Sequence, residues 1–430
     1  MPFSSLSSEQ TNKGYELTEI RVGETIASVR VPQNRSGLAF MVRHASFPLG
    51  FFMQALPPGS TLNGDEIASR IVRDFGPGIL RDLIECQLVS AAATVPLDFP
   101  SLDVVVCTRD RTEQLSRCLN SFRQMLGDAD DSLPGRILVI DNSPANDETE
   151  RIVRTFPKVS YYRELVPGLD FARNRALAES SAEFIAFVDD DAIVDRSWLA
   201  GLKHAWHMHP DAAGFTGPVF PLELETGAQV LFEQMGGFGS DFTMMRFGPT
   251  IPDSKRYPYN AGMVGTGCNM VFRRQLLLDL GGFDEALDTG EPLPGGGDID
   301  MFYRLIRSGQ VVVREPKMVV YHQHRRGRAQ LRHQMWTWGL SIMAFMSKCY
   351  LREPTNRSTI REWIGWWFRY TLRKMTIVYR GQPDRRPADL VLAEIVGAIV
   401  GLCGEYQRSW RRVARRRTSC TRQDQQRSLH

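Results

Sequence analysis

Short apolar runs alternate with amphipathic stretches between residues 101 and 325, and this alternation restricts the possible folds more than any other feature. The runs Leu102–Cys107, Ile137–Ile140 and Phe184–Val188 have the length of buried strands. Between the first two runs, the segment Leu115–Leu126 places apolar side chains on one face of a helix. Strands that alternate with helices predict an α/β domain, with a mostly parallel sheet flanked by helices on both faces.

Polar residues stand where these strands are expected to end. Thr108 follows the first run and Asp141 the second, and the triplet Asp189-Asp190-Asp191 follows the third. In open sheets of parallel strands, ligands bind beyond the carboxyl ends of the strands. We therefore expect these side chains to meet at one ligand site.

The acidic triplet is the most informative part of this predicted site. Carboxylates that are held together away from water repel one another, and a divalent cation relieves the repulsion. Oxygen ligands of this kind suit Mn²⁺ or Mg²⁺. Alternate residues of an extended chain point the same way, so Asp189 and Asp191 can share one cation while Asp190 points elsewhere. The alternative is a solvated acidic turn, with Asp195 nearby.

Changes in composition divide the chain into four parts. Residues 1–100 are expected to form a small α+β accessory domain, which ends in a linker at Ala91–Pro100. Residues 101–325 carry the alternating pattern. Residues 326–417 are rich in Trp and Arg and are expected to be helical, and residues 418–430 form a polar tail that is expected to be disordered.

Overall composition excludes several classes of protein. The formal net charge is only +3, so no nucleic-acid partner is expected. The seven cysteines include no C-x-x-C pair, which argues against a zinc knuckle and suits reduced thiols in the cytoplasm. The first residues lack a signal-peptide pattern, and no run of 18 apolar residues occurs.

The C-terminal region allows two interpretations. Its Trp and Arg residues suit a peripheral contact with the inner face of a membrane, with Leu390–Cys403 as an interfacial helix. Alternatively, this apolar stretch is too short to span a bilayer and packs as a helical lid with a basic surface.

Several motifs in residues 101–325, taken together and in order, resemble the family-2 glycosyltransferases with the GT-A fold. They are Val104–Arg111, Val139–Ser143, Gly168–Asn174, Phe187–Asp191, Gly281–Glu285 and Gly297–Asp300. The resemblance implies a Rossmann-like GT-A domain and an inverting transfer from a nucleoside-diphosphate sugar, UDP- or dTDP-linked. The acceptor would be a hydroxyl of a glycan, a lipid or a small molecule. A divalent cation, Mn²⁺ or Mg²⁺, would lie on the diphosphate.

The resemblance also implies roles for individual residues. The nucleotide sugar would contact Thr108, Arg111, Asp141, Arg173, Asp189 and Asp190. Asp189 and Asp191 would hold the cation, completed by His322 or His324, between which the sequence does not choose. Arg325 or Arg326 would neutralise phosphate. Asp284, Glu285 and Asp300 would lie on the acceptor side.

Asp298 is the candidate catalytic base. An inverting displacement needs a group that removes the proton of the acceptor hydroxyl. The family usually has Glu-Asp at this place, whereas this chain has Gly297-Asp298, so the acceptor contact of that Glu is missing. The alternative role for Asp298 is that of a helix N-cap. The segment Leu293–Gly297 before it is expected either to close over the substrates or to form a tight turn.

Other functions fit the sequence less well. A sugar-phosphate nucleotidylyltransferase would have a Gly-rich loop after the first strand, where this chain has Cys107–Arg111. No G-x-G-x-x-G follows that strand, which argues against a dinucleotide oxidoreductase. The alternative that is not an enzyme is a glycan- or lipid-binding module that retains the fold.

Overall fold

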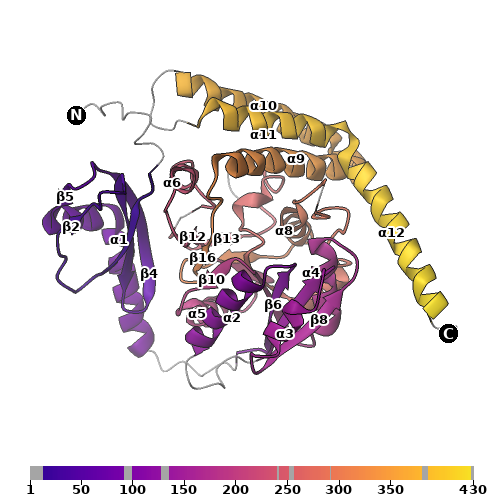
Figure 1. Ribbon diagram of the computed structural model, residues 1–430, viewed down its shortest axis with the longest axis horizontal. Helices are drawn as coiled ribbons and strands as arrows, with labels where there is room; N and C mark the ends of the chain where they lie inside the picture. Colours follow the sequence, from indigo (N-terminus) through magenta and orange to yellow (C-terminus); the bar gives the residue numbers. More distant parts are fainter. Residues whose placement is uncertain are drawn as a thin grey trace.

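The computed structural model describes residues 13–91, 99–126, 135–239, 242–250, 256–290, 292–379 and 386–427. Most of the expected linker at Ala91–Pro100 and the last three residues of the expected tail lie outside these ranges. An N-terminal unit, a central α/β domain and a layer of C-terminal helices follow one another along the chain (Figure 1).

An eight-stranded sheet forms the centre of the molecule. Four parallel strands, in the order β9-β6-β7-β8, continue through antiparallel β14 into β11, β15 and β13. The mostly parallel sheet expected from the sequence is therefore confirmed. The strands are β6 (Leu102–Thr108), β7 (Ile137–Asn142), β8 (Val159–Glu164), β9 (Phe184–Asp189), β11 (Gly214–Thr216), β13 (Met245–Phe247), β14 (Asn269–Arg273) and β15 (Val312–Arg314).

Alternation of side chains along each strand builds a separate core on each face of this sheet. On one face, Val104 and Val106 of β6 pack with α2, α3 and α5. On the other face, Val105 packs with α4, α7 and α8. These helices are α2 (Thr112–Leu126), α3 (Glu148–Val153), α4 (Leu169–Glu179), α5 (Trp198–Met208), α7 (Arg274–Asp279) and α8 (Gly297–Arg307).

A smaller three-stranded sheet lies beside the end of β9. Its order is β10-β16-β12, from β10 (Ala192–Val194), β16 (Val320–His322) and β12 (Val219–Pro221). β10 begins immediately after the acidic triplet and runs antiparallel to β16. Helix α6 (Gly227–Gln234) follows β12 and begins with a capping box made by Thr226 and Gln229.

The N-terminal unit is a small α+β structure (Figure 1). Its sheet has the order β1-β3-β4, and a short pair β2-β5 and helix α1 complete it. Phe40 and Ile67 lie in its own core, which forms because β3 and α1 both bury one apolar face. The elements are β1 (Glu16–Arg21), β2 (Val29–Arg30), β3 (Gly37–His44), β4 (Phe47–Ala55), β5 (Thr61–Leu62) and α1 (Gly64–Ala91).

Long helices make up the C-terminal part, namely α9 (Arg328–Arg352), α10 (Arg357–Tyr379), α11 (Ala388–Val400) and α12 (Tyr406–Arg427). α9 packs against α11, and α12 runs from these helices along the side of the central domain (Figure 1), where Arg416 donates to Pro167 O. The close approach of α9 and α11 depends on Gly339 and Gly397, since a side-chain carbon at either would overlap backbone of the other helix. Helix α12 continues to Arg427, into the segment expected to be disordered.

The C-terminal helices share an apolar core with the central sheet. Met343 and Phe345 of α9 and Trp363 of α10 belong to the same apolar core as Val105 and Ile185 of the sheet. Among the described residues, no helix is both long and apolar enough to cross a bilayer.

Candidate functional site

A cavity of about 810 Å³ opens at the carboxyl ends of the parallel strands. Thr108 and Asn142 line it from β6 and β7, and the acidic triplet lines it from β9. This position agrees with the sheet-edge site expected from the sequence. Across the cavity stand the start of α8 and the helices α9, α10 and α11.

The three aspartates of the triplet have different neighbours. Asp190 is buried and accepts hydrogen bonds from Thr108 Oγ1 (2.7 Å) and Arg111 Nη1 (3.1 Å). Asp189 and Asp191 instead group with His322. Thr108 and Arg111 thus hold the middle residue in place, and its two neighbours are left to face a common point.

Asp189, Asp191 and His322 form a potential cation site. Each offers one ligand atom, and these atoms lie within 4.8 Å of one another. His322 comes from β16, where it is paired with Ala192, the residue after the triplet. Its Nε2 lies 3.0 Å from Asp191 Oδ1, and its buried Nδ1 has no hydrogen-bond partner. Two carboxylates and an imidazole are ligands that Mn²⁺ accepts and Mg²⁺ tolerates, so the donor set fits a divalent cation.

Negative charge is in excess at the group formed by Asp189, Asp191 and His322. Burial and then the neighbouring Asp191 raise the pKa of Asp189 to about 6. Burial also acts on Asp191, but contact with His322 and Arg111 lowers the pKa of that carboxyl to about 2. Burial alone would lower the pKa of His322, whereas Asp191 outweighs it and raises the pKa. A bound cation would relieve the repulsion that Asp189 experiences.

His324 lies in a different environment from His322. Its Nε2 is 2.7 Å from Glu233 Oε1 of α6, and burial lowers its pKa. It is absent from the three-residue group, although it lines the cavity. Arg325 also lines the cavity, whereas Arg326 pairs with Glu223 and Glu225 and does not. Of the two candidate histidines, the structure therefore brings His322 to the carboxylates. Of the two candidate arginines, it brings Arg325 to the cavity.

Asp298 lies in the cavity wall at the start of α8. Its Oδ2 accepts a hydrogen bond from the backbone N–H of Gly267 at 2.8 Å, and its Oδ1 accepts one from Ile299 N–H. The N-cap position of α8 is occupied by Gly296, so Asp298 is not the cap. Its carboxylate is held between two segments and half-buried at the edge of the cavity.

Arg173 is buried in a carboxylate cluster that the sequence did not foresee. Its Nη1 lies 3.0 Å from Asp170 Oδ1 and 3.3 Å from Asp288 Oδ2. Burial raises the pKa of both carboxyls, with further repulsion from Asp288 on Asp170 and from Asp298 on Asp288. Arg173 still lines the cavity, and Asp288 accepts a hydrogen bond from Gly297 N–H. The cluster thus joins α4 to the start of α8.

Asp141 is fully buried and does not line the cavity. Its Oδ2 accepts a hydrogen bond from Tyr161 of β8 at 2.8 Å, and burial raises its pKa. The next residue, Asn142, lines the cavity instead. The strand turns the Asp141 side chain into the core beside the cavity, and its contact with a nucleoside stays a prediction.

The three residues expected on the acceptor side lie away from the cavity. Asp284 and Asp300 both contact Lys348 Nζ at 2.6 Å, and Glu285 bonds to Asn174. They line a second pocket of about 760 Å³. Asp300 follows Asp298 by two residues on a helix, and a rotation of roughly 200° turns it to the opposite face. Asp298, unlike these three residues, lines the same cavity as Asp189 and Asp191.

Helices after residue 326 supply cavity residues that sequence reasoning missed. Trp338 and Ile342 come from α9, Trp367 from α10 and Glu394 from α11. Burial raises the pKa of Glu394, which also lies near Arg386. The position of Glu394 inside the apolar stretch Leu390–Cys403 was the one sequence signal that this helix borders a polar site.

This combination of a mostly parallel sheet and a carboxylate-lined cavity at its carboxyl edge defines the class of protein. Residues 103–281 match the sequence model of the family described as glycosyl transferase family 2. The central domain is therefore a family-2 glycosyltransferase domain, as its motifs predicted. Helix α8, strand β15 and the C-terminal helices lie outside the matched segment.

Curated relatives share only part of their length with this chain. A pre-mycofactocin glycosyltransferase of Mycobacterium tuberculosis is 28% identical over 225 residues, which cover 52% of this chain and 42% of the relative. The succinoglycan biosynthesis protein ExoM of Rhizobium meliloti is 27% identical over 243 residues, which cover 55% of this chain and 71% of that protein. Among solved structures, a mannosyltransferase of Pyrobaculum calidifontis in complex with GDP-Man and Mn²⁺ superposes with a TM-score of 0.46 and 18% identity, over 78% of this chain and 97% of its own.

Proposed function

We propose that the protein transfers a sugar from a nucleoside-diphosphate sugar to an acceptor hydroxyl, with inversion at the anomeric carbon. The observation that carries this proposal is the composition of one cavity. It holds the group Asp189, Asp191 and His322 together with the carboxylate of Asp298, and these lie in or beside a family-2 domain.

The donor would bind along the carboxyl ends of β6, β7 and β9. Asp189, Asp191 and His322 are the residues that would hold Mn²⁺ or Mg²⁺. A bound divalent cation supplies charge stabilisation to a leaving diphosphate. Arg325 in the cavity wall adds a second positive charge for the diphosphate, since guanidinium and phosphate form charge-assisted hydrogen bonds.

Asp298 would act as the general base. Its carboxylate accepts the proton of the acceptor hydroxyl while that oxygen forms its bond to the anomeric carbon. The bond from this carbon to the diphosphate oxygen breaks on the opposite side, which inverts the configuration. The hydrogen bond from Gly267 N–H to Oδ2 restricts rotation of the carboxylate. The position of the base is therefore defined before substrate binds.

The acceptor would enter from the side of the C-terminal helices. Trp338 and Trp367 offer apolar ring surface there, and Glu394 offers a hydrogen-bond acceptor. This combination suits a hydroxylated ring, whose faces are apolar and whose edges donate hydrogen bonds. A glycan or glycosylated acceptor therefore fits the wall better than a bare acyl chain.

The outer face of α11 supports peripheral membrane contact. Leu392, Val396 and Ile399 recur about once per turn and are about half exposed, and the neighbouring helix α10 also carries exposed arginines, Arg369 and Arg373. Apolar side chains beside arginines favour the surface of an anionic bilayer. In co-sedimentation with phosphatidylserine-containing vesicles, Leu392→Glu/Ile399→Glu should lose binding, whereas Val72→Glu/Leu80→Glu on exposed positions of α1 should retain it.

Nucleotide release from a panel of nucleotide sugars tests the proposed reaction. The protein is incubated with UDP-, dTDP- and GDP-sugars, with Mn²⁺, with Mg²⁺ or with chelator, and the released nucleotide is measured. Release should require the cation and should be lost in Asp191→Ala. NMR of the product should show the inverted anomer. Release that persists with chelator or in Asp191→Ala would contradict the cation site, and a retained anomer would contradict the displacement.

A further inference from the structure

The N-terminal unit contacts the sheet that carries the proposed cation site. Met41 and Phe51 of its β3 and β4 pack against Phe220 of β12 and Val319, which precedes β16. The Phe51 and Phe220 rings lie 5.4 Å apart. The small sheet β10-β16-β12 is thus covered by a part of the chain that lies outside the matched family segment.

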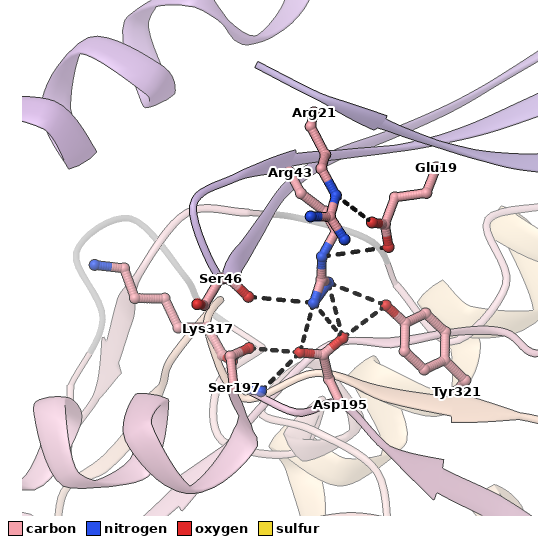
Figure 2. A network of polar contacts seen from close by, with 8 residues as sticks. All are labelled: Glu19, Arg21, Arg43, Ser46, Asp195, Ser197, Lys317 and Tyr321. Carbon is pink, nitrogen blue, oxygen red and sulfur yellow. Dashed lines mark hydrogen bonds and ion pairs between the residues drawn. The ribbon is translucent and has the colours of Figure 1, made fainter. Parts of the chain in front are cut away.

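Arg43 makes a buried ion pair between the N-terminal unit and the central domain (Figure 2), and Asp82 of α1 makes another with Lys317. The Nη1 and Nη2 of Arg43 donate to both carboxylate oxygens of Asp195, at 2.8 and 2.9 Å. Both side chains are more than nine-tenths buried. Asp195 also accepts hydrogen bonds from Tyr321 Oη (2.9 Å) and Ser197 Oγ (2.6 Å). A buried, bidentate pair with these extra donors has a fixed geometry.

Asp195 stands at the opposite end of the strand pair from the proposed cation ligands, whereas Tyr321 lies in the middle of β16, next to His322. β10 connects Asp191 to Asp195, and β16 contains both Tyr321 and His322. Backbone hydrogen bonds close the pair at each end, from Gln323 N–H to Asp191 O and from Asp195 N–H to Val319 O. Four residues of strand span only about 13 Å. Any change in register or angle between β10 and β16 would therefore separate Asp191 from His322.

We propose that Arg43 is a positioning residue for the cation site, acting through Asp195 and Tyr321 on the β10–β16 pair. This proposal rests on the proposed function, because it assumes that Asp189, Asp191 and His322 bind a divalent cation. It assigns the N-terminal unit a role: the unit locks the strand pair from its far end so that the imidazole and the carboxylates keep one separation. Arg43 itself touches neither substrate nor cation.

Binding of Mn²⁺ to the full chain tests the proposal without any sugar donor. Free Mn²⁺ is followed by its electron paramagnetic resonance signal, with and without UDP or GDP. The variants are Arg43→Lys, which keeps the charge but not the two-pronged contact, and Arg43→Met/Asp195→Asn, which leaves no lone buried charge. We expect each to weaken Mn²⁺ binding roughly tenfold or more, as loss of outer partners does at other metal sites.

Arg35→Met is the matched control. Arg35 donates to Glu225 O at 3.3 Å across the same interface, but it contacts neither β10 nor β16. Its variant should lose stability without losing Mn²⁺ affinity. Thermal unfolding of each variant without metal measures the purely structural effect.

Three other outcomes would each overturn the proposal. Wild-type Mn²⁺ affinity in both Arg43 variants would show that the pair only joins the two units. Equal losses of affinity in the Arg35 control would show a general effect of interface stability. If the wild type itself bound no Mn²⁺, the cation site of the proposed function would fail and this inference would fail with it.

Discussion

At the scale of single residues, the triplet contains one supporting carboxylate, Asp190, and two that we propose as cation ligands, Asp189 and Asp191. Asp190 is held by Thr108 and Arg111, and this contact turns Asp189 and Asp191 toward His322. The alternation of side chains along an extended chain was enough to predict this division. The choice of His322 over His324 was not predictable, because it depends on pairing of β16 with β10 and on Glu233 of α6.

Asp298→Asn tests the residue that we assign as base. The amide keeps the shape of the side chain, and its single oxygen can accept from Gly267 N–H while the contact with Ile299 N–H is lost, but it cannot take a proton. We expect kcat for transfer to fall roughly 10²–10⁴-fold. Cation-dependent binding of the nucleotide, measured by calorimetry, should stay at the wild-type level. Transfer at an unchanged rate would remove the assignment.

Binding of the cation should weaken as the pH falls. The raised pKa values of Asp189, about 6, and of His322 mean that both groups gain protons on moderate acidification, and each proton competes with the cation. Affinity for Mn²⁺ should therefore drop about tenfold or more between about pH 7.5 and pH 5. Titration at several pH values measures this drop, and His324→Gln should show the same dependence, since His324 pairs with Glu233. An affinity independent of pH would contradict the ligand set.

At the scale of elements, long apolar segments were predictable and short ones were not. Continuous apolar runs predict the strands β6, β7 and β9, and the helical spacing of apolar residues predicts α2. β10, β12 and β16 have three residues each, too few for any periodicity. These three strands carry His322 and receive the N-terminal unit, so local sequence could not show how that half of the site is assembled.

The start of α8 depends on a glycine for its position. A side-chain carbon at Gly297 would overlap the Asp170 carboxylate, and Asp170 is fixed by Arg173. Gly297→Ala should therefore push α8 outward, cost about 1–3 kcal/mol of stability and displace Asp298. Chemical unfolding and transfer assays measure both effects.

Gly78→Ala provides the control for this change. Gly78 lies in α1 with nothing within 4 Å of the added carbon, so alanine should leave activity intact and raise stability by up to about 1 kcal/mol. If Gly297→Ala behaved like Gly78→Ala, the close packing of α8 on Asp170 would not matter for the site.

At the scale of the whole molecule, the expected boundary at residue 325 does not separate two cores. Met343 and Trp363 belong to the core that covers one face of the sheet. The motif-bearing region 101–325 was predictable as a unit because its signals are local. The share of the C-terminal helices in its core was not, because contacts between distant segments leave no pattern in either segment alone.

The shared core predicts the behaviour of fragments. A chain of residues 1–325 keeps α4, α7 and α8 but loses α9 and α10, which complete the core on one face of the sheet. It should show no cooperative thermal unfolding and should bind a dye for exposed apolar surface. A chain of residues 1–417 keeps α9, α10 and α11 and should unfold like the full chain. Cooperative unfolding of the 1–325 fragment near the temperature of the full chain would contradict the shared core.

The cavity has walls that are far apart in the sequence, from Cys107 of β6 to Glu394 of α11. During translation, the ribosome must add the stretch from residue 281 to residue 394 after the family segment is finished, which takes roughly 6–23 s at about 5–20 residues per second. In that interval one apolar face of the nascent sheet has α4 and α7 but lacks α8, α9 and α10, which complete its core. The growing chain thus exposes apolar surface that a chaperone can cover, and its cavity is completed only after α11 has left the ribosome.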